Sequence, residues 1–136
     1  MKSIPDELVS LLDYCHSLAN LLLIEQGEFY PFGVYLSNDQ KITQRLFHDG
    51  DDFPLSTGLI NIIKHDFDRQ LAIKAITASA VVYDAKVTNS SYPEAADVIV
   101  VRLASQTLDA PILYYLPYQS DEDKIEYGTG WIEMGA

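Results

Sequence analysis

Residues 75–87 read AITASAVVYDAKV, and this stretch decides the fold class. Small and β-branched residues dominate it, as is typical of a strand. Two sets of residues alternate along it, Ile76, Ala78, Ala80 and Val82 against Thr77, Ser79, Val81 and Tyr83. Because successive side chains of a strand point to opposite faces, this alternation predicts a β-strand of an antiparallel sheet.

Further strands are predicted on both sides of this stretch. Towards the C-terminus, residues 98–103 and 112–118 are apolar runs separated by the polar turn at 105–109. Towards the N-terminus, Phe32, Val34 and Leu36 would share one face of a strand that ends at the turn signal 37–39. Residues 41–47 would then complete a hairpin with it.

Two helices are predicted from apolar spacing of three and four residues. The first carries the stripe Leu8, Leu11, Leu12, Cys15, Leu18, Ala19 and Leu22. Ser3 with Asp6 is typical of a capping box, Pro5 fits the first turn, and Gly27 is placed to end this helix. The second helix, residues 56–71, would turn Leu59, Ile62, Ile63, Phe67 and Leu71 inwards.

The resulting element order is α-β-β-α-β-β-β, which predicts an α+β fold. One five-stranded antiparallel sheet with both helices against it would bury every apolar stripe. Residues 1–136 would form a single domain, and the polar tail 121–136 would pack on its body because a free Trp131 would be sticky. The element order resembles the profilin-like and roadblock-type group, in which the sheet runs 2-1-5-4-3.

Residues 27–33, GEFYPFG, resemble a G-E-F-x-P-F-G segment found after the first helix in a family of small, uncharacterised bacterial proteins. Residues 116–118, LPY, and 126–128, EYG, are similar to the ending of that family. At Asn38-Asp39-Gln40 this chain departs from the family, whose members often read Asp-Gly there. The resemblance implies a fold and brings no established activity.

The composition is acidic, with 9 Lys and Arg against 20 Asp and Glu and a net charge of −11. Such a surface repels phosphate backbones and anionic membranes, so neither a nucleic acid nor a membrane is an expected partner. A basic protein is the expected partner. The single cysteine, Cys15, excludes an intrachain disulfide. The start of the chain lacks the features of a signal peptide, which indicates the cytoplasm.

Several residues are candidates for a binding surface. Glu28 and Tyr30 would lie at the sheet edge, although the glycines and aromatics around them also fit a purely structural role. Tyr114 and Tyr118 fall on the last predicted strand, and tyrosine serves both sheet packing and interfaces. Two acidic groups complete the set, Glu126 with Tyr127 in the tail and the loop carboxylates Asp49, Asp51 and Asp52.

No motif predicts catalysis, a metal or a cofactor. The acidic loop does not match an EF-hand, because Phe53 and Ile60 occupy positions where ligands belong. His16, His48 and His65 lack zinc-site spacing, and no nucleophile elbow or P-loop occurs.

The sequence therefore favours a non-enzymatic, acidic protein-binding module, of which an immunity or antagonist protein would be one form. A small-molecule sensor with a pocket near Glu28 and Tyr30 is the alternative, and an enzyme of unrecognised type comes third. A homodimer is compatible with each.

Overall fold

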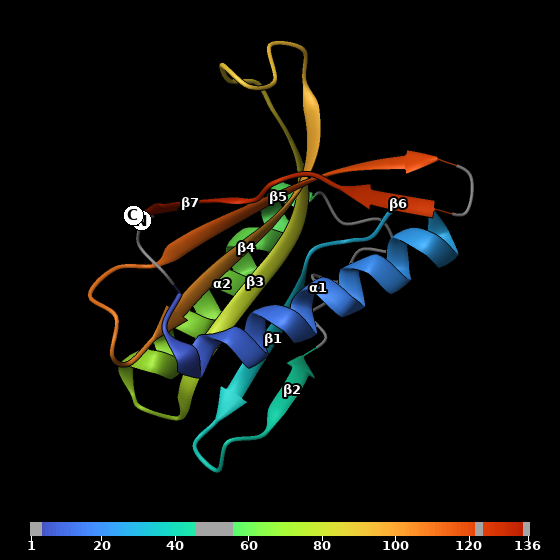
Figure 1. The fold of residues 1–136 in the computed structure, drawn as a ribbon. Coiled ribbons are helices and arrows are strands. Elements are labelled where there is room, and N and C mark those ends of the chain that lie inside the picture. Colours follow the sequence, from blue (N-terminus) through green and yellow to red (C-terminus); the bar gives the residue numbers. More distant parts are fainter. Residues whose placement is uncertain (1–3, 46–55, 122–123, 135–136) are drawn as a thin grey trace.

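The computed structural model describes residues 4–45, 56–121 and 124–134. Over these residues the chain forms two helices and an antiparallel sheet of seven strands (Figure 1). The elements are α1 (Asp6–Gln26), β1 (Phe32–Ser37), β2 (Ile42–Arg45), α2 (Ser56–Ala72), β3 (Ile76–Val87), β4 (Ala96–Ser105), β5 (Ile112–Asp121), β6 (Lys124–Tyr127) and β7 (Trp131–Met134).

The α+β class is confirmed, but the predicted number of five strands is wrong. The tail contributes two more strands, because β6 and β7 both pair with β5. The strand order is β2-β1-β3-β4-β5-β6, so β3 lies between β1 and β4. This order differs from the 2-1-5-4-3 arrangement of the profilin-like and roadblock-type group, since the last three main strands form a simple meander that begins beside β1.

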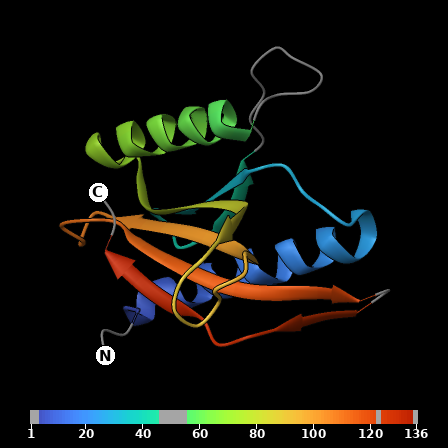
Figure 2. The same cartoon turned by 90° about the horizontal axis from the view of Figure 1, so that it is seen from above.

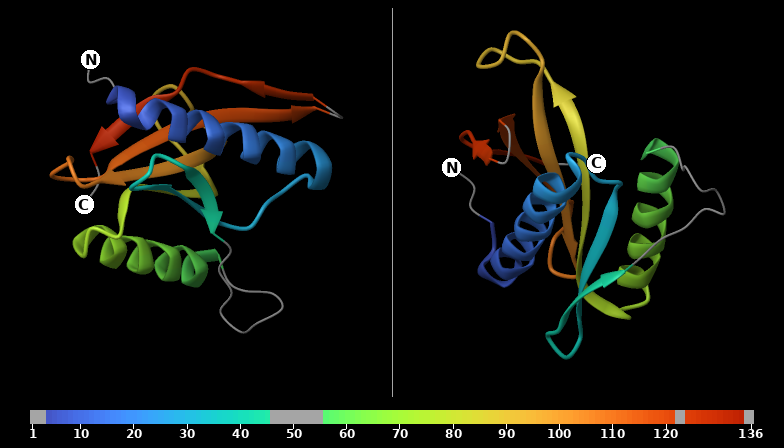
Figure 3. Two further views of the ribbon diagram at one scale, coloured as in Figure 1. Left: turned by 90° about the horizontal axis from the view of Figure 1, so that it is seen from below. Right: turned by 90° about the vertical axis from the view of Figure 1, so that its right-hand side faces the viewer.

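The two helices lie on opposite faces of the sheet, which gives three layers (Figures 2 and 3). The larger core lies under α1 and includes the even-numbered residues Ala78, Ala80 and Val82 of β3. The smaller core lies under α2 and includes Ile76 and Val81. From Ala78 onwards the alternation of β3 therefore supplies one set of side chains to each helix. The predicted grouping of Ile76 with Ala78 is wrong, since Ile76 lies in the α2 core, at the point where the register with β1 shifts.

Helix α1 has six side chains at 7% exposure or less, five of them from the predicted stripe. Leu18 and Leu22 of that stripe are only half-buried, and Leu23 is buried although the predicted stripe does not include it. The buried residues are Leu8, Leu11, Leu12, Cys15, Ala19 and Leu23. Pro5 is the N-cap residue of α1, whereas the sequence predicts it in the first turn, and it makes no side-chain capping bond. Ser3 of the predicted capping box lies outside the described residues. Gly27 ends the helix in the left-handed conformation, φ 78°, and its N–H donates to the Leu23 carbonyl.

By length and composition alone, α1 could also cross a membrane, with a mean hydropathy of 1.3. The core helix of a globular protein meets the same criterion. Here its buried stripe packs against β1, β3 and β4, which accounts for its apolar character.

The 27–33 segment has a structural role in its second half. The rings of Phe29 and Phe32 pack 5.6 Å apart, and Phe32 enters the core under α1. Gly33 faces α2, where the ring of Phe67 and the side chain of Ile63 occupy the space that a Cβ at position 33 would need. Glycine therefore lets α2 approach the backbone of β1 closely.

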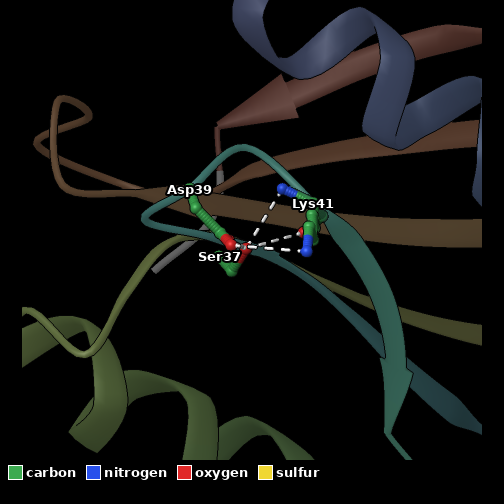
Figure 4. Close-up of polar contacts among 3 residues, drawn as sticks. All are labelled: Ser37, Asp39 and Lys41. Atoms are coloured by element: carbon green, nitrogen blue, oxygen red, sulfur yellow. Dashed lines mark hydrogen bonds and ion pairs between the residues drawn. The ribbon is translucent and has the colours of Figure 1, made fainter.

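The β1–β2 hairpin closes through a turn held by Ser37 (Figure 4). The Ser37 hydroxyl accepts a hydrogen bond from the Lys41 N–H at 3.0 Å and is also bonded to the Asp39 carboxylate. Gln40 adopts a left-handed φ of 69°, a conformation that glycine favours. Asn38 donates to the Lys74 carbonyl at 3.0 Å and so ties this turn to the turn after α2.

Replacing Gly33 with alanine should destabilise the protein by about 1–3 kcal/mol, because the added Cβ overpacks the core. That atom would lie 2.6 Å from Phe67 Cε2 and 2.9 Å from Ile63 Cγ2. Urea unfolding followed by circular dichroism measures the change. The matched control is Gly58→Ala in α2, where nothing lies within 4 Å. The control should be neutral or stabilising by up to about 1 kcal/mol, and equal losses in both variants would contradict the close-packing explanation.

Candidate binding groove

The sheet divides at one end of β4 and β5. Their pairing stops at Asp97↔Tyr118, while β3 and β4 remain paired to Val87↔Ala96 and β5 continues with β6. In Figure 1 the tip of the β3–β4 hairpin rises at the top, and β5 and β6 run to the right. A groove of about 990 Å³ lies in this fork. We call it the fork groove, and its lining is Ser91, Tyr92, Pro93, Glu94, Ala95, Ala96, Asp97, Pro117, Tyr118, Gln119, Ser120, Glu126, Tyr127 and Gly128.

The fork groove is acidic. Within the described part of the chain, its charged lining residues are the three carboxylates Glu94, Asp97 and Glu126. Lys86 pairs with one of these carboxylates, its Nζ lying 3.2 Å from Asp97 Oδ1. The two side chains of this pair are 75% and 43% exposed, so water weakens their attraction. A cationic group is therefore the ligand that the groove's charge favours.

Tyr118 forms the floor of the fork groove and is 8% exposed. Its hydroxyl donates to Asp84 Oδ1 at 2.9 Å. Burial and the hydrogen bond to this carboxylate both raise the pKa of Tyr118. Burial also raises the pKa of Asp84, although the bond from Tyr118 works in the opposite direction. Tyr118 is thus a neutral phenol at the floor of the groove, and its hydrogen bond to Asp84 fixes the position of its hydroxyl.

Tyr127 lies directly across the β5–β6 ladder from Tyr118. It is 41% exposed, and its hydroxyl donates to Asn20 Oδ1 of α1. Partial burial raises its pKa. This contact connects the end of β6 to the helix and holds one tyrosine ring at the edge of the groove.

Tyr92 lines the fork groove and belongs to a stack of aromatic rings whose other members lie behind it. Tyr92, from the β3–β4 loop, stacks on Trp131 at 6.3 Å, and Trp131 stacks on Tyr115 at 5.2 Å with an interplanar angle of 12°. Such pairs contribute about 0.5–1.5 kcal/mol each beyond their buried area. The stack therefore braces the hairpin loop against the strand at the edge of the sheet.

The tail forms a bulge directly before Trp131. Between the pairs Tyr118↔Tyr127 and Tyr115↔Trp131, the tail has one residue more than β5. An extra residue bends a strand and increases its twist. Gly130 lies in the bulge, where a Cβ would come within 2.9 Å of the Tyr115 carbonyl oxygen. Only glycine fits this approach without a backbone shift.

Of the residues predicted from sequence, the structure brings Tyr118, Glu126 and Tyr127 together in the fork groove. Tyr114 does not line it. Its half-buried ring lies between β5 and α1, 5.2 Å from the ring of His16. Alternation does not separate Tyr114 from Tyr118, because the two residues are four apart and share one face of β5.

Glu28 and Tyr30 are exposed in the connection from α1 to β1, Tyr30 by 54%. Neither residue lines the fork groove or the smaller groove beside α2. The predicted loop carboxylates Asp49, Asp51 and Asp52 lie outside the described residues.

Sequence reasoning missed a row of aromatic residues on the α2 face. Tyr83, Val100, Tyr115 and Trp131 are direct neighbours across four strands. Val100 is buried, while the three aromatic residues are half-buried. Strict alternation along β5 was the available signal, because adjacent tyrosines at 114 and 115 must face opposite sides of a sheet.

The described residues contain no group of three or more His, Cys, Asp or Glu side chains that could hold a metal ion. Burial lowers the pKa of His16, whose Nε2 has no hydrogen-bond partner among the described residues. The Cys15 thiol is buried, and this burial raises its pKa to about 12. A neutral thiol buried in the core is unsuited to nucleophilic chemistry.

No family model, curated protein or solved structure matches the chain.

Burial and a hydrogen bond to Glu133 raise the pKa of Tyr115 from 10.0 to about 12. The folded state therefore resists ionisation of Tyr115 more than the unfolded state does. The protonated Tyr115 hydroxyl therefore contributes fully to the free energy of unfolding below pH 10, and this contribution is lost as the pH rises to about 12. Urea unfolding should show the stability difference between wild type and Tyr115→Phe shrinking across this window. Glu133→Gln should lower the pKa of Tyr115 only part of the way back to 10.0, since burial is the larger cause of the shift. The pH range over which stability is lost should therefore become narrower. A difference that stays constant with pH would contradict the assignment.

Proposed function

We propose that this chain is a non-enzymatic protein-binding module whose fork groove receives a basic, extended segment of another protein. One observation carries the proposal: three carboxylates and three tyrosines line a groove at the point where two paired strands separate. Acidic side chains select for lysine and arginine. Tyrosine rings add apolar contact and can attract a cation by about 0.5–2 kcal/mol.

The shape of the groove supports a peptide segment as its ligand. A volume of about 990 Å³ equals the upper end of the usual range for small-molecule sites, about 300–1,000 Å³. Pro93 and Pro117 line the groove with rigid backbone. An extended segment could lie between the two hairpins and present alternate side chains to the acids and to the rings.

The charge of the whole chain supports the same kind of partner. A net charge of −11 steers basic proteins towards the surface and repels nucleic acids and anionic membranes. An immunity or antagonist protein that covers a basic active site is one specific form of this proposal.

The test uses Trp131, the only tryptophan, as a built-in reporter beside the groove. A short peptide that alternates lysine and threonine should change its fluorescence on binding, and affinity should fall as salt rises. The double variant Glu94→Gln/Glu126→Gln should bind about tenfold more weakly, because each exposed ion pair contributes up to about 1 kcal/mol.

The matched control is Asp13→Asn/Glu25→Gln, which removes two exposed charges from α1 at positions that do not line the groove. This control should bind the peptide as wild type does. Affinity capture from the lysate of the host, with the wild type and both double variants, extends the test to natural partners. Equal weakening by both double variants would show a general charge effect and would overturn the groove as the binding site.

A further inference from the structure

Arg102 is an unusual residue for its position. It lies in the middle of β4, where every residue from Val98 to Ser105 is buried, and it is itself only 7% exposed. Burying a guanidinium is strongly unfavourable unless a partner compensates its charge, and such a pair is seldom the most stable choice for a core position. A buried arginine on a sheet face therefore needs an explanation beyond packing.

The ion pair that compensates Arg102 is asymmetric. Its Nη1 donates to Asp68 Oδ1 at 3.1 Å, and its Nη2 donates to Asp68 Oδ2 at 3.4 Å. The arginine side chain is 9% exposed, whereas the Asp68 side chain, on α2, is 46% exposed. The Arg102 guanidinium is thus buried against the sheet, and the Asp68 carboxylate contacts it from the solvent-exposed side. A different carboxylate could take the place of Asp68 without any movement of the arginine.

A groove opens above this ion pair. It has a volume of about 580 Å³ and lies between α2, β4 and the β4–β5 connection. Arg102 and Asp68 line it together with apolar residues from three segments, Leu71, Ala104, Leu108 and Pro111. Lys64 adds a second positive charge. We call this site the arginine groove.

We propose that the arginine groove binds a small organic carboxylate, whose two oxygens replace those of Asp68 on Arg102. The planar guanidinium matches a carboxylate with two parallel hydrogen bonds. Leu71, Leu108 and Pro111 then cover the apolar part of the molecule. Asp68 acts as an internal competitor that neutralises the arginine when the groove is empty. This site is separate from the fork groove, which begins at the opposite end of β4, and does not depend on the protein-binding function.

Benzoate is the probe, because it joins a carboxylate to an apolar ring, and benzamide is its uncharged counterpart. Isothermal titration calorimetry of wild type, Asp68→Asn and Asp109→Asn measures the affinities. Benzoate should bind Asp68→Asn about tenfold more tightly than wild type, because the internal competitor is gone. Asp109→Asn removes the same charge from the lining of the same groove and should match wild type within about twofold. Benzamide should bind none of them measurably.

Arg102→Gln should abolish benzoate binding while circular dichroism confirms that it folds. If that variant fails to fold, Ala104→Leu in the Asp68→Asn background keeps the arginine and fills the floor of the groove, and it should abolish binding in the same way. The proposal is overturned if Asp68→Asn does not bind benzoate, if Asp109→Asn gains as much affinity as Asp68→Asn, or if binding survives the loss of Arg102 or the filling of the floor.

Discussion

The architecture depends on one constraint, the burial of strand β3 on both of its faces. Ala78 and Ala80 are fully buried under α1, and Val81 is fully buried under α2. Because neighbouring side chains in a strand point in opposite directions, a single strand supplies part of both cores. The small alanines leave room for α1 on one face of the sheet, and Gly33 of the adjacent strand lets the Phe67 and Ile63 side chains of α2 approach the backbone on the other face. The three layers follow from this alternation.

The centre of the sheet is buried between the two helices, whereas one end of β4 and β5 lines the fork groove. Helices cover its middle, but beyond the pair Asp97↔Tyr118 the two hairpins separate. Strands twist, and the bulge around Gly130 adds to the twist of the tail. The stack of Tyr92 on Trp131 then holds the separated hairpin in place. The fork groove is therefore a consequence of how the sheet ends, and no dedicated domain or inserted loop is required to form it.

The two grooves differ in charge and lie towards opposite ends of β4. The fork groove begins at Asp97 and is lined by carboxylates, in keeping with the net charge of −11. The arginine groove has a buried cation in its floor, although the chain has only 9 lysines and arginines. Burying a charge is energetically unfavourable, so the buried Arg102 cation is the feature that most favours a second ligand class, carboxylates, in this acidic protein.

The sequence by itself determined the elements, because apolar periodicity reports directly which face of a helix or strand is buried. It predicted both helices, the hairpin and the meander. It did not determine the strand order or the two tail strands, since β6 and β7 have only four residues each, too few to show a clear period of two. Alternation along β5 already separates Tyr115 from Tyr118. Only the tertiary structure decided which face each tyrosine occupies, because a shift of one residue in register would exchange the two faces. Arg102 and Asp68 are 34 residues apart in sequence, and only the packing of α2 on the sheet brings their charges together.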